Sequence, residues 1–306
     1  MHISDILTKL ARWSKLGVAL GAALVMAACG DTERVTYDGP EFMLFSDTLT
    51  VCAVQNDTEE FDISVGSTSA TDYNRRVAIE VVDSLSNAIE GKHYKVNEYS
   101  VVIPAGSCVG TFKMRGISSN IGVTDSLCVT LRLVCDDGKQ NKLYGNTTRV
   151  MLQKACPLNM DDFTGNALVT STFLYNYSTS MSRLIKVERD PKDAYTLVLK
   201  NFLYDDYDVK VKFTHDDILN PILHYDDQKM VLTSTAFGTK YGDGWLNIKE
   251  PSGYVSYYSS CEHFMMLYST VYVPGMAEGT NVVGTFVHSI EMVSEGRAEE
   301  LKEAGY

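Results

Sequence analysis

The chain has 306 residues and a formal net charge of −12 at pH 7. That length suits two domains of ordinary size. An acidic surface repels phosphate backbones and anionic lipid headgroups, so this charge argues against binding to nucleic acid or to lipid through a basic field. The composition favours neutral or cationic partners, or an acidic surface that serves solubility.

An export signal opens the chain. Lys9, Arg12 and Lys15 form a basic flank, and residues 16–25 form an apolar run. A membrane-spanning helix needs about 20 apolar residues, so this run is too short to cross a bilayer. A basic flank, a short apolar core and small residues are typical of a cleaved signal. The sequence therefore predicts a signal peptide over residues 1–28.

The end of this signal resembles the lipobox of bacterial lipoproteins. Ala27 and Ala28 precede Cys29, and Met26 stands where that family usually has leucine. The resemblance implies cleavage before Cys29 and attachment of lipid to its thiol, including acyl chains such as palmitate. Each buried acyl CH2 contributes about 0.8 kcal/mol, which makes this an anchor in membrane lipid. An ordinary secretory signal with a chance cysteine is the alternative.

Residues 29–41 are predicted to be a lipidated tether, because they are polar and include Gly39 and Pro40. Asp31 and Glu33 follow the cysteine closely. Such acidic residues resemble the surface-export signal of lipoproteins in the Bacteroidetes. The resemblance implies a location on the outer membrane, facing the cell surface, with the periplasmic face as the alternative.

The pattern over residues 42–155 is that of β-strands. Phe61, Ile63 and Val65 alternate with polar residues, as expected for strands with one buried face. Residues 104–106 (Pro-Ala-Gly) separate two strand-like runs and predict a hairpin turn. We expect a β-sandwich of about seven strands.

Residues 88–94, the strand 99–103 and the turn 104–106 resemble a Calx-beta sandwich. That family has a Gly-x-Asp-Tyr segment, a strand and a Pro-x-Gly turn, and His93 stands here in place of the aspartate. The loop that is acidic in calcium-binding members is here 117–126, where only Asp125 is charged. Calcium prefers six to eight oxygen ligands. The resemblance therefore implies the sandwich without a metal, and we predict no cofactor.

A second β region is predicted over residues 156–293, with a polar tail, helical or frayed, over 294–306. Val209, Val211 and Phe213 alternate with two lysines and give the clearest strand. The candidate strands are 167–177, 184–189, 195–201, 209–213, 229–233, 244–248, 254–259, 264–273 and 284–293. This succession predicts an up-and-down barrel or sandwich, making the chain all-β. The opening Phe-Thr-Gly at 163–165 resembles the lipocalin-like domains of Bacteroidetes lipoproteins.

Six cysteines follow Cys29, and an even number outside the cytoplasm is compatible with disulfides. Cys52, Cys108 and Cys128 lie in apolar strand-like runs, where cysteine behaves as a small hydrophobic residue. Cys128 and Cys135 would point to opposite faces of one strand. We expect mostly free, buried thiols, with the pairing of the six left open.

Aromatic residues suggest a ligand site in the second region. Of 18 tyrosines, 13 follow Cys156. Tyr241, Trp245, Tyr257 and Tyr258 cluster near glycine-bearing turns and are the predicted ligand-binding residues. Flat rings beside polar side chains suit the apolar faces and hydroxyls of sugars. The alternative is that these residues simply fill the strands of a barrel.

No catalytic set emerges from the sequence. The acidic clusters at 205–208, 215–217 and 224–227 lie between strands, where aspartate favours turns. His263 and His288 lie in strand-like runs and are expected to be hydrogen-bonded core residues. No nucleophile motif and no phosphate-binding glycine loop is present. We predict no catalytic residue and no metal ligand.

These observations predict a membrane-anchored, non-catalytic binding lipoprotein. Its expected setting is an accessory component of an outer-membrane complex that takes up nutrients, with a glycan or peptide as ligand and a transporter as possible partner. A structural or adhesive surface protein is the first alternative. A hydrolase of unrecognised type is the second, because catalytic groups can lie far apart in sequence.

Overall fold

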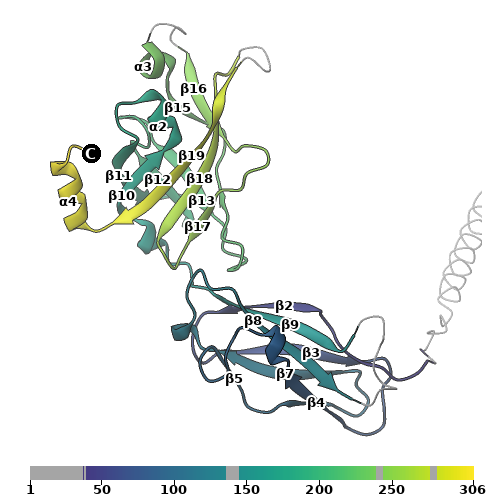
Figure 1. The fold of residues 1–306 in the computed structure, drawn as a ribbon. Helices are drawn as coiled ribbons and strands as arrows, with labels where there is room; N and C mark the ends of the chain where they lie inside the picture. The colour runs from purple at the N-terminus through teal and green to yellow at the C-terminus, as the bar shows by residue number, and fades with distance from the viewer. Residues whose placement is uncertain (1–36, 38, 136–144, 239–243, 276–280) are drawn as a thin grey trace, which may run out of the picture.

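The computed structural model describes residues 37, 39–135, 145–238, 244–275 and 281–306. The described chain is almost entirely β, as the alternating patterns predicted (Figure 1). Two small sheets are formed before residue 155, and one large sheet after residue 164. In the described part of the chain, no helix is both long and apolar enough to cross a membrane.

The first region is a sandwich of two sheets. The four-stranded sheet contains, in order, β1 (Met43–Phe45), β3 (Glu60–Ser67), β7 (Val109–Gly116) and β5 (Tyr94–Val96). The five-stranded sheet contains β2 (Leu49–Val54), β9 (Thr147–Lys154), β8 (Leu127–Val134), β4 (Arg75–Val81) and β6 (Ser100–Ile103). Strands β2 and β9 run parallel, and the other pairs are antiparallel. Short 3₁₀ turns η1 (Asp83–Leu85) and η2 (Ser118–Asn120) connect strands.

The core of the sandwich follows from the predicted alternation. Ile63 and Val65 of β3 are buried between the sheets, together with Phe112 and Leu131. The turn at residues 104–106 corrects one expectation. Strand β6 belongs to the five-stranded sheet and β7 to the four-stranded sheet, so this turn carries the chain between sheets and does not close a hairpin. Gly106 has φ +76°, a conformation that suits glycine.

The second region is a single large sheet. Its path contains β14 (Leu223–His224), β13 (Val209–Phe213), β12 (Thr196–Lys200), β11 (Ser182–Arg189), β10 (Gly165–Ser171), β19 (Val282–Val293), β18 (Phe264–Tyr272), β16 (Trp245–Lys249) and β15 (Gln228–Leu232). Strand β17 (Tyr257–Ser259) pairs with β18 beside this path. The second region also contains helices α2 (Thr172–Tyr177), α3 (Thr233–Phe237) and α4 (Glu295–Glu303) and the turn η4 (Met160–Phe163). Most consecutive strands are neighbours, and β10 pairs with β19, so the sheet is an up-and-down meander that is open between β14 and β15.

The large sheet curls until its two edges approach. The amide of Gln228 on β15 accepts from the Lys210 N–H of β13 at 2.9 Å and donates to the Lys210 carbonyl at 3.0 Å. Ile222 and Tyr257 form a further isolated bridge. The space inside is filled by apolar side chains, including Val209, Val211 and Phe213 as predicted. The result is a packed half-barrel.

One predicted strand proved too long. Residues 167–177 were expected to form a single strand, but β10 ends at Ser171 and α2 follows. The Ser171 hydroxyl accepts from the amides of Phe173 and Leu174 at 3.1 and 3.3 Å. This is an N-cap, which satisfies amides that a helix leaves without partners.

The polar tail at 294–306 is ordered around α4. The Ser294 hydroxyl caps the helix by accepting from the Arg297 N–H at 3.3 Å. Ala298 and Leu301 are buried, so one face of the helix packs on the rest of the chain, beside β10 and β11 (Figure 1). The tail is therefore helical and packed, and the frayed alternative is wrong.

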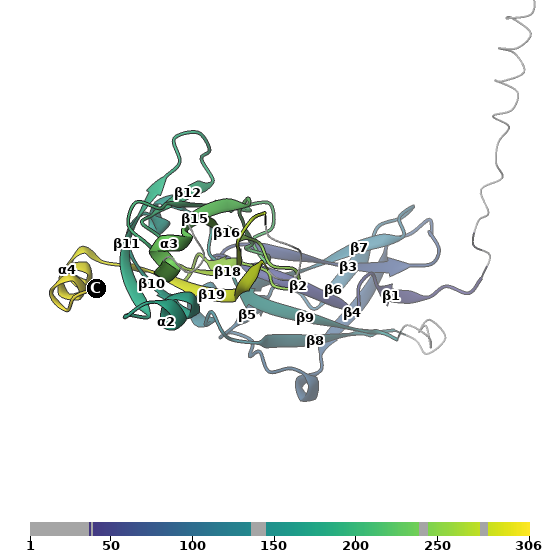
Figure 2. The same cartoon turned by 90° about the horizontal axis from the view of Figure 1, so that it is seen from above.

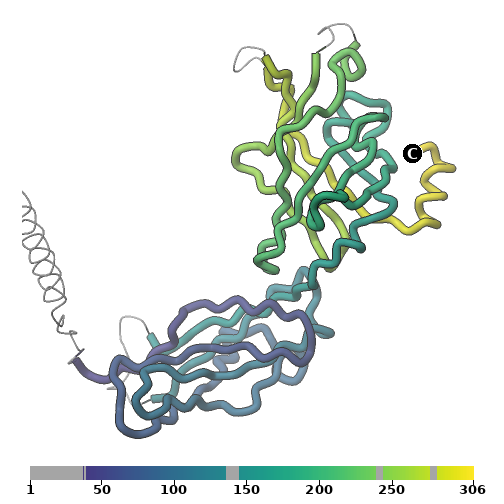
Figure 3. The backbone as a smooth tube through the Cα atoms, turned by 180° about the vertical axis from the view of Figure 1, so that it is seen from behind, coloured from purple at the N-terminus to yellow at the C-terminus, as the bar shows by residue number. Residues whose placement is uncertain are grey.

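The sandwich and the curled sheet lie end to end. Figure 2 and Figure 3 show the described chain entering the sandwich at one end and leaving it at the other. The connection follows β9, where the Ala155 N–H donates to the Val54 carbonyl at 3.1 Å. This junction positions the site described next.

Candidate functional site

The predicted ligand residues do not form one cluster. Tyr241 and the predicted lipidation residue Cys29 lie outside the described residues. Tyr257 pairs with Met266 near the start of β18, whereas Asn247, just after Trp245, pairs with Tyr272 at its end. Six residues of extended strand span about 20 Å. Trp245 is therefore far from the two tyrosines of β17.

Trp245 packs as a half-buried strand residue. Its ring meets the Tyr207 ring edge-on, with centroids 5.9 Å apart. The Lys229 ammonium lies 4.4 Å from the centroid of the Trp245 ring, in a cation–π contact. These neighbours give the tryptophan a structural role at its end of the curled sheet.

Tyr257 and Tyr258 point to opposite faces, as neighbours in a strand do. Tyr258 is buried, its hydroxyl donates to the Thr214 carbonyl at 2.7 Å, and burial raises its pKa. Its ring packs in the core against Phe213. Tyr257 is 38% exposed and lies edge-on to Phe264, with ring centroids 6.1 Å apart. Tyr257 can reach a ligand, and Tyr258 supports the strand beneath it.

Tyr257 borders an open hollow of about 550 Å³ between the two regions, which we call the junction hollow. The linker forms one wall, and the loops of the curled sheet form the other. Its aromatic and charged lining residues are Lys154, Tyr195, His215, Asp217, Tyr257, Tyr258, Glu262 and Phe264. This volume is typical of small-ligand sites.

A disulfide closes one side of the junction hollow. Cys156 of the linker is bonded to Cys261 in the turn between β17 and β18, with Cα atoms 5.2 Å apart. This corrects part of the expectation of free, buried thiols. Cys52 and Cys128 are free and buried as expected, whereas Cys108 is free but exposed. The bond holds the linker against the curled sheet.

The loop opposite the disulfide is held by Asp217 and by a ring contact with a neighbouring loop. The Asp217 carboxylate accepts from the Leu219 N–H at 2.9 Å. The Tyr195 and His215 rings are in contact, with centroids 3.8 Å apart. Tyr195 is 38% exposed. The hollow therefore presents fixed aromatic surfaces beside carboxylates, an arrangement that binds sugar rings or peptide side chains.

The acidic clusters are turns, as predicted. Asp208 accepts from the Asn201 N–H at 3.0 Å and forms an ion pair with Lys200. Asp227 accepts from Asn247 at 3.0 Å and from the Tyr272 hydroxyl. Both carboxylates are therefore already bound to other groups of the protein.

The two candidate core histidines differ. His288 is fully buried between the hydroxyls of Ser171 and Ser269, as expected. His263 lies in an exposed turn with φ +53°, so its prediction as a core residue is wrong. The turn follows Cys261, and the chain there must bend between β17 and β18.

The loop at 117–126 does not fit calcium. The Lys154 ammonium donates to the Ser118 carbonyl at 3.3 Å, so a cationic side chain already occupies this loop. The Asp57 carboxylate accepts from the Ser119 N–H and hydroxyl at 3.0 and 2.9 Å, and Asp125 accepts from the Gly122 N–H at 2.7 Å. No group of three metal-ligating side chains exists in the described ranges. The residues present do not suit a cation that needs six to eight oxygens.

His93, in place of the Calx-beta aspartate, also has a structural role. Its Nδ1 accepts from the Ile89 N–H at 3.0 Å, and the ring is buried. Burial, followed by the nearby Lys92 charge, lowers the pKa of His93. A neutral imidazole closes this turn.

Sequence reasoning missed Tyr195, His215 and the linker residues of the junction hollow. Tyr195 and His215 come from different loops. Their proximity depends on the strand register of the β-meander, which the sequence pattern does not give. One signal was available. Cys156 flanks the predicted domain boundary, where a cysteine outside an apolar run is a better candidate for a disulfide than one inside it.

These features define a two-part, all-β protein with an open hollow beside its linker. Residues 143–304 match the domain of unknown function DUF4984, and the chain belongs to that family. Comparison with curated proteins gives no match.

Several solved structures share limited similarity with the chain. The apo-form Calx CBD1 domain is 19% identical, with 38% of this chain and 98% of that one covered and a TM-score of 0.31. A protein of unknown function from Bacteroides ovatus is 12% identical, with 81% and 90% covered and a TM-score of 0.34. An auxiliary nutrient binding protein from Bacteroides thetaiotaomicron is 14% identical, with 81% and 91% covered and a TM-score of 0.30.

Proposed function

We propose that this protein is a membrane-anchored, non-catalytic binding lipoprotein that captures a glycan or peptide for an outer-membrane nutrient uptake complex. The observation that carries the proposal is the junction hollow, where Tyr195, Tyr257 and Phe264 lie beside Asp217 and Glu262. Aromatic faces stack on the C–H faces of sugars, and carboxylates accept hydrogen bonds from their hydroxyls.

The architecture of the hollow supports binding. The Cys156–Cys261 disulfide fixes the linker wall, and Asp217 fixes the opposite loop. A wall that is already ordered loses little conformational entropy when a ligand binds, which favours affinity. The aromatic rings therefore need little rearrangement.

Tyr257→Ala tests the hollow directly. Binding of the wild-type chain to arrays of glycans and peptides would identify a ligand, and calorimetry would measure its Kd. Removal of an exposed stacking ring should weaken that Kd at least ten-fold. Tyr254→Ala is the matched control, because Tyr254 is 58% exposed on a neighbouring segment and stacks on Tyr268 outside the hollow. Equal affinity in both variants would refute the site.

The anchor and the complex need a separate experiment in cells. The full chain and its Cys29→Ser variant would be compared for acyl labelling and for recovery in the outer-membrane fraction. We expect both to be lost in the variant, and we expect the wild-type protein to co-purify with a transporter in mild detergent. Recovery of the lipid-modified protein alone would instead favour a structural or adhesive role.

A further inference from the structure

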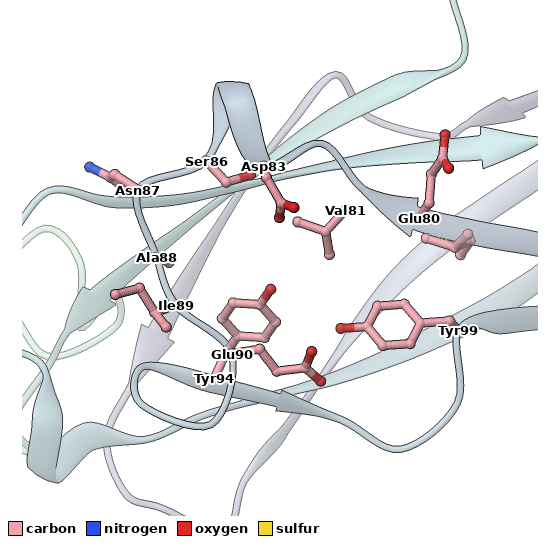
Figure 4. Close-up of a pocket in the computed structure, with 11 residues that line it drawn as sticks. Glu80, Val81, Asp83, Ser86, Asn87, Ala88, Ile89, Glu90, Tyr94 and Tyr99 are labelled. Carbon is pink, nitrogen blue, oxygen red and sulfur yellow. The ribbon is translucent and has the colours of Figure 1, made fainter.

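The sandwich contains a second hollow, of about 530 Å³, that shares no residue with the junction hollow. We call it the sandwich hollow. It lies between the end of β4, the segment after it, Tyr94 at the start of β5 and Tyr99 just before β6 (Figure 4). Its lining residues are Ile79, Glu80, Val81, Asp83, Ser86, Asn87, Ala88, Ile89, Glu90, Tyr94 and Tyr99.

The upper wall of this hollow is held rigidly to β8. The Val82 N–H donates to the Thr130 carbonyl at 2.8 Å, and the Asn87 N–H donates to the Cys128 carbonyl at 3.0 Å. The side chains of Ser86 and Asn87 take part in the same pairing, because Thr130 N–H donates to Ser86 Oγ and Asn87 Oδ1 accepts from Cys128 N–H. These two polar side chains are committed to the fold.

The remaining polar groups face one another. Figure 4 shows the hydroxyls of Tyr94 and Tyr99 and the carboxylates of Asp83 and Glu90 pointing into the same space. Tyr94 is only 2% exposed, so its hydroxyl is a buried polar group directed into this space. A phenol oxygen can accept a hydrogen bond from a ligand, and an ionised carboxylate can only accept. Burial and the Glu90 charge raise the pKa of Tyr94.

The hollow therefore presents oxygen acceptors and net negative charge. The Asp83 and Glu90 carboxylates and the two phenol oxygens face a ligand that enters it. Among the ion pairs of the described residues, none joins Asp83 or Glu90 to a lysine, arginine or histidine. Glu80 differs, because its carboxylate is paired with Arg132.

We propose that the sandwich hollow binds a primary alkylammonium group. An ammonium is a cation with three donors and no acceptor, which suits a hollow of two carboxylates and two phenol oxygens. Phenol rings attract cations by their faces, and Val81 and Ile89 supply apolar surface for the methylene stem. The same chemistry is offered by a lysine side chain on a polypeptide and by a free diamine.

The test uses calorimetry on the full chain with three probes. They are an acetylated and amidated Gly-Lys-Gly peptide, the same peptide with its lysine Nε-acetylated, and cadaverine. The lysine peptide and cadaverine should both bind, and the acetyl-lysine peptide should bind at least ten-fold more weakly. Tighter binding of the peptide would identify a protein lysine as the source, and tighter binding of cadaverine a free amine.

Glu90→Gln should weaken binding of the lysine peptide at least ten-fold, since it removes charge from an exposed residue without changing its shape. Glu59→Gln is the matched control, because Glu59 is exposed and does not line the hollow, and it should leave the affinity within two-fold. Both variants should keep the thermal midpoint of the wild type. Equal binding of the acetyl-lysine peptide, no binding of either amine, or an unchanged affinity in Glu90→Gln would each overturn the proposal. The result is independent of Tyr257→Ala, which belongs to the other hollow.

Discussion

His288 is a titratable side chain in the middle of an apolar core. The Ser171 hydroxyl lies 2.8 Å from Nδ1 and the Ser269 hydroxyl lies 2.7 Å from Nε2. Because Ser171 already accepts two amides of α2, its proton goes to Nδ1, and Nε2–H then donates to Ser269. Complete burial disfavours the charged ring and lowers the pKa of His288 to about 3.

This histidine should make the protein acid-sensitive. The unfolded chain takes up a proton near pH 6.5, whereas the folded chain does so only near pH 3, so the unfolded state binds more protons between these values. Above pH 6.5, protonation of His288 therefore takes nothing from the unfolding free energy. Between pH 6.5 and about pH 3, it lowers the unfolding free energy by roughly 1.4 kcal/mol per pH unit.

The measurement is urea unfolding from pH 7 to pH 4 for the wild type and His288→Gln. Glutamine keeps a donor and an acceptor without titrating. The difference in unfolding free energy between the two proteins should shrink as the pH falls. Other acid-sensitive groups contribute equally to the unfolding free energy of both proteins, so the comparison cancels their effect. One such group is Asp190, whose pKa the Lys210 ammonium lowers. A constant difference would mean that His288 accepts its proton at an ordinary pH.

Arg75 is a buried cation that ties four segments together. Its guanidinium donates to Glu41 Oε1 and Ser67 Oγ at 2.6 Å, and to the carbonyls of Ser69 and Ser107 at 2.7 Å. Arg75→Met should cost about 3–5 kcal/mol of unfolding free energy, because it removes the buried cation and its four hydrogen bonds and leaves the Glu41 charge without its counterion.

The neighbouring Arg76 provides the control for this prediction. Its ion pair with Glu98 is more than 60% exposed on both sides, so Arg76→Met should cost less than about 1 kcal/mol. Chemical unfolding of the two variants gives the comparison. Similar losses in both would show that the buried cluster adds nothing to the stability of the sandwich.

At the level of the elements, β13 and β15 meet at a seam that is closed by a side chain. The Gln228 side chain takes the place of a strand in pairing with the Lys210 backbone. Gln228→Ala should lower the unfolding free energy by about 1–2 kcal/mol, because two hydrogen bonds are lost. The Lys210 amide should then exchange with deuterium faster.

Gln228→Glu separates the two bonds of the seam. A carboxylate retains the acceptor for the Lys210 N–H but loses the donor to the Lys210 carbonyl. Protection of the Lys210 amide in this variant should lie between the wild type and Gln228→Ala. Unchanged protection in both variants would mean that the seam is closed by other contacts.

Strand positions were predictable from sequence wherever one face is buried. Val209, Val211 and Phe213 are buried and the two lysines between them are exposed, because the period of a strand is two. The switch from β10 to α2 was not predictable from that period. It depends on the Ser171 cap, and Ser171 also fits the strand pattern that precedes it. The all-β class was therefore predictable, and the short helix was not.

At the level of the whole molecule, the disulfide should stabilise one region only. Cys156 and Cys261 are separated by 105 residues, all belonging to the linker and the curled sheet. Closing a loop of that length removes roughly 4–5 kcal/mol of entropy from the unfolded chain. In Cys156→Ser/Cys261→Ser, the unfolding transition of the curled sheet should move to lower temperature while that of the sandwich stays.

Calorimetry and proteolysis would check this prediction. The double variant should also be cleaved faster at Lys154, beside the freed linker. Cys108→Ser is the control, because that thiol is exposed and free, and both transitions should stay in place. A shift of both transitions in the double variant would show that the two regions unfold together.

The site was less predictable than the fold because it depends on contacts between distant segments. Tyr257 and Tyr258 were identified from composition, yet only Tyr257 is exposed, since neighbours in a strand face opposite ways. Trp245 was grouped with them by proximity in sequence. The strand register places it at the other end of β18. Sequence proximity is a poor guide in a meander, where each turn sends the chain back across the sheet.

The chain enters the sandwich at the end opposite the linker. The longest strands of the sandwich have 8 residues, which corresponds to a length of about 26 Å. On a chain anchored at Cys29, the sandwich would act as a rigid stalk, and Arg75 would fix the tether at its base by holding Glu41. The junction hollow would then stand at a set height above the bilayer, where it could meet a neighbouring protein of matching height.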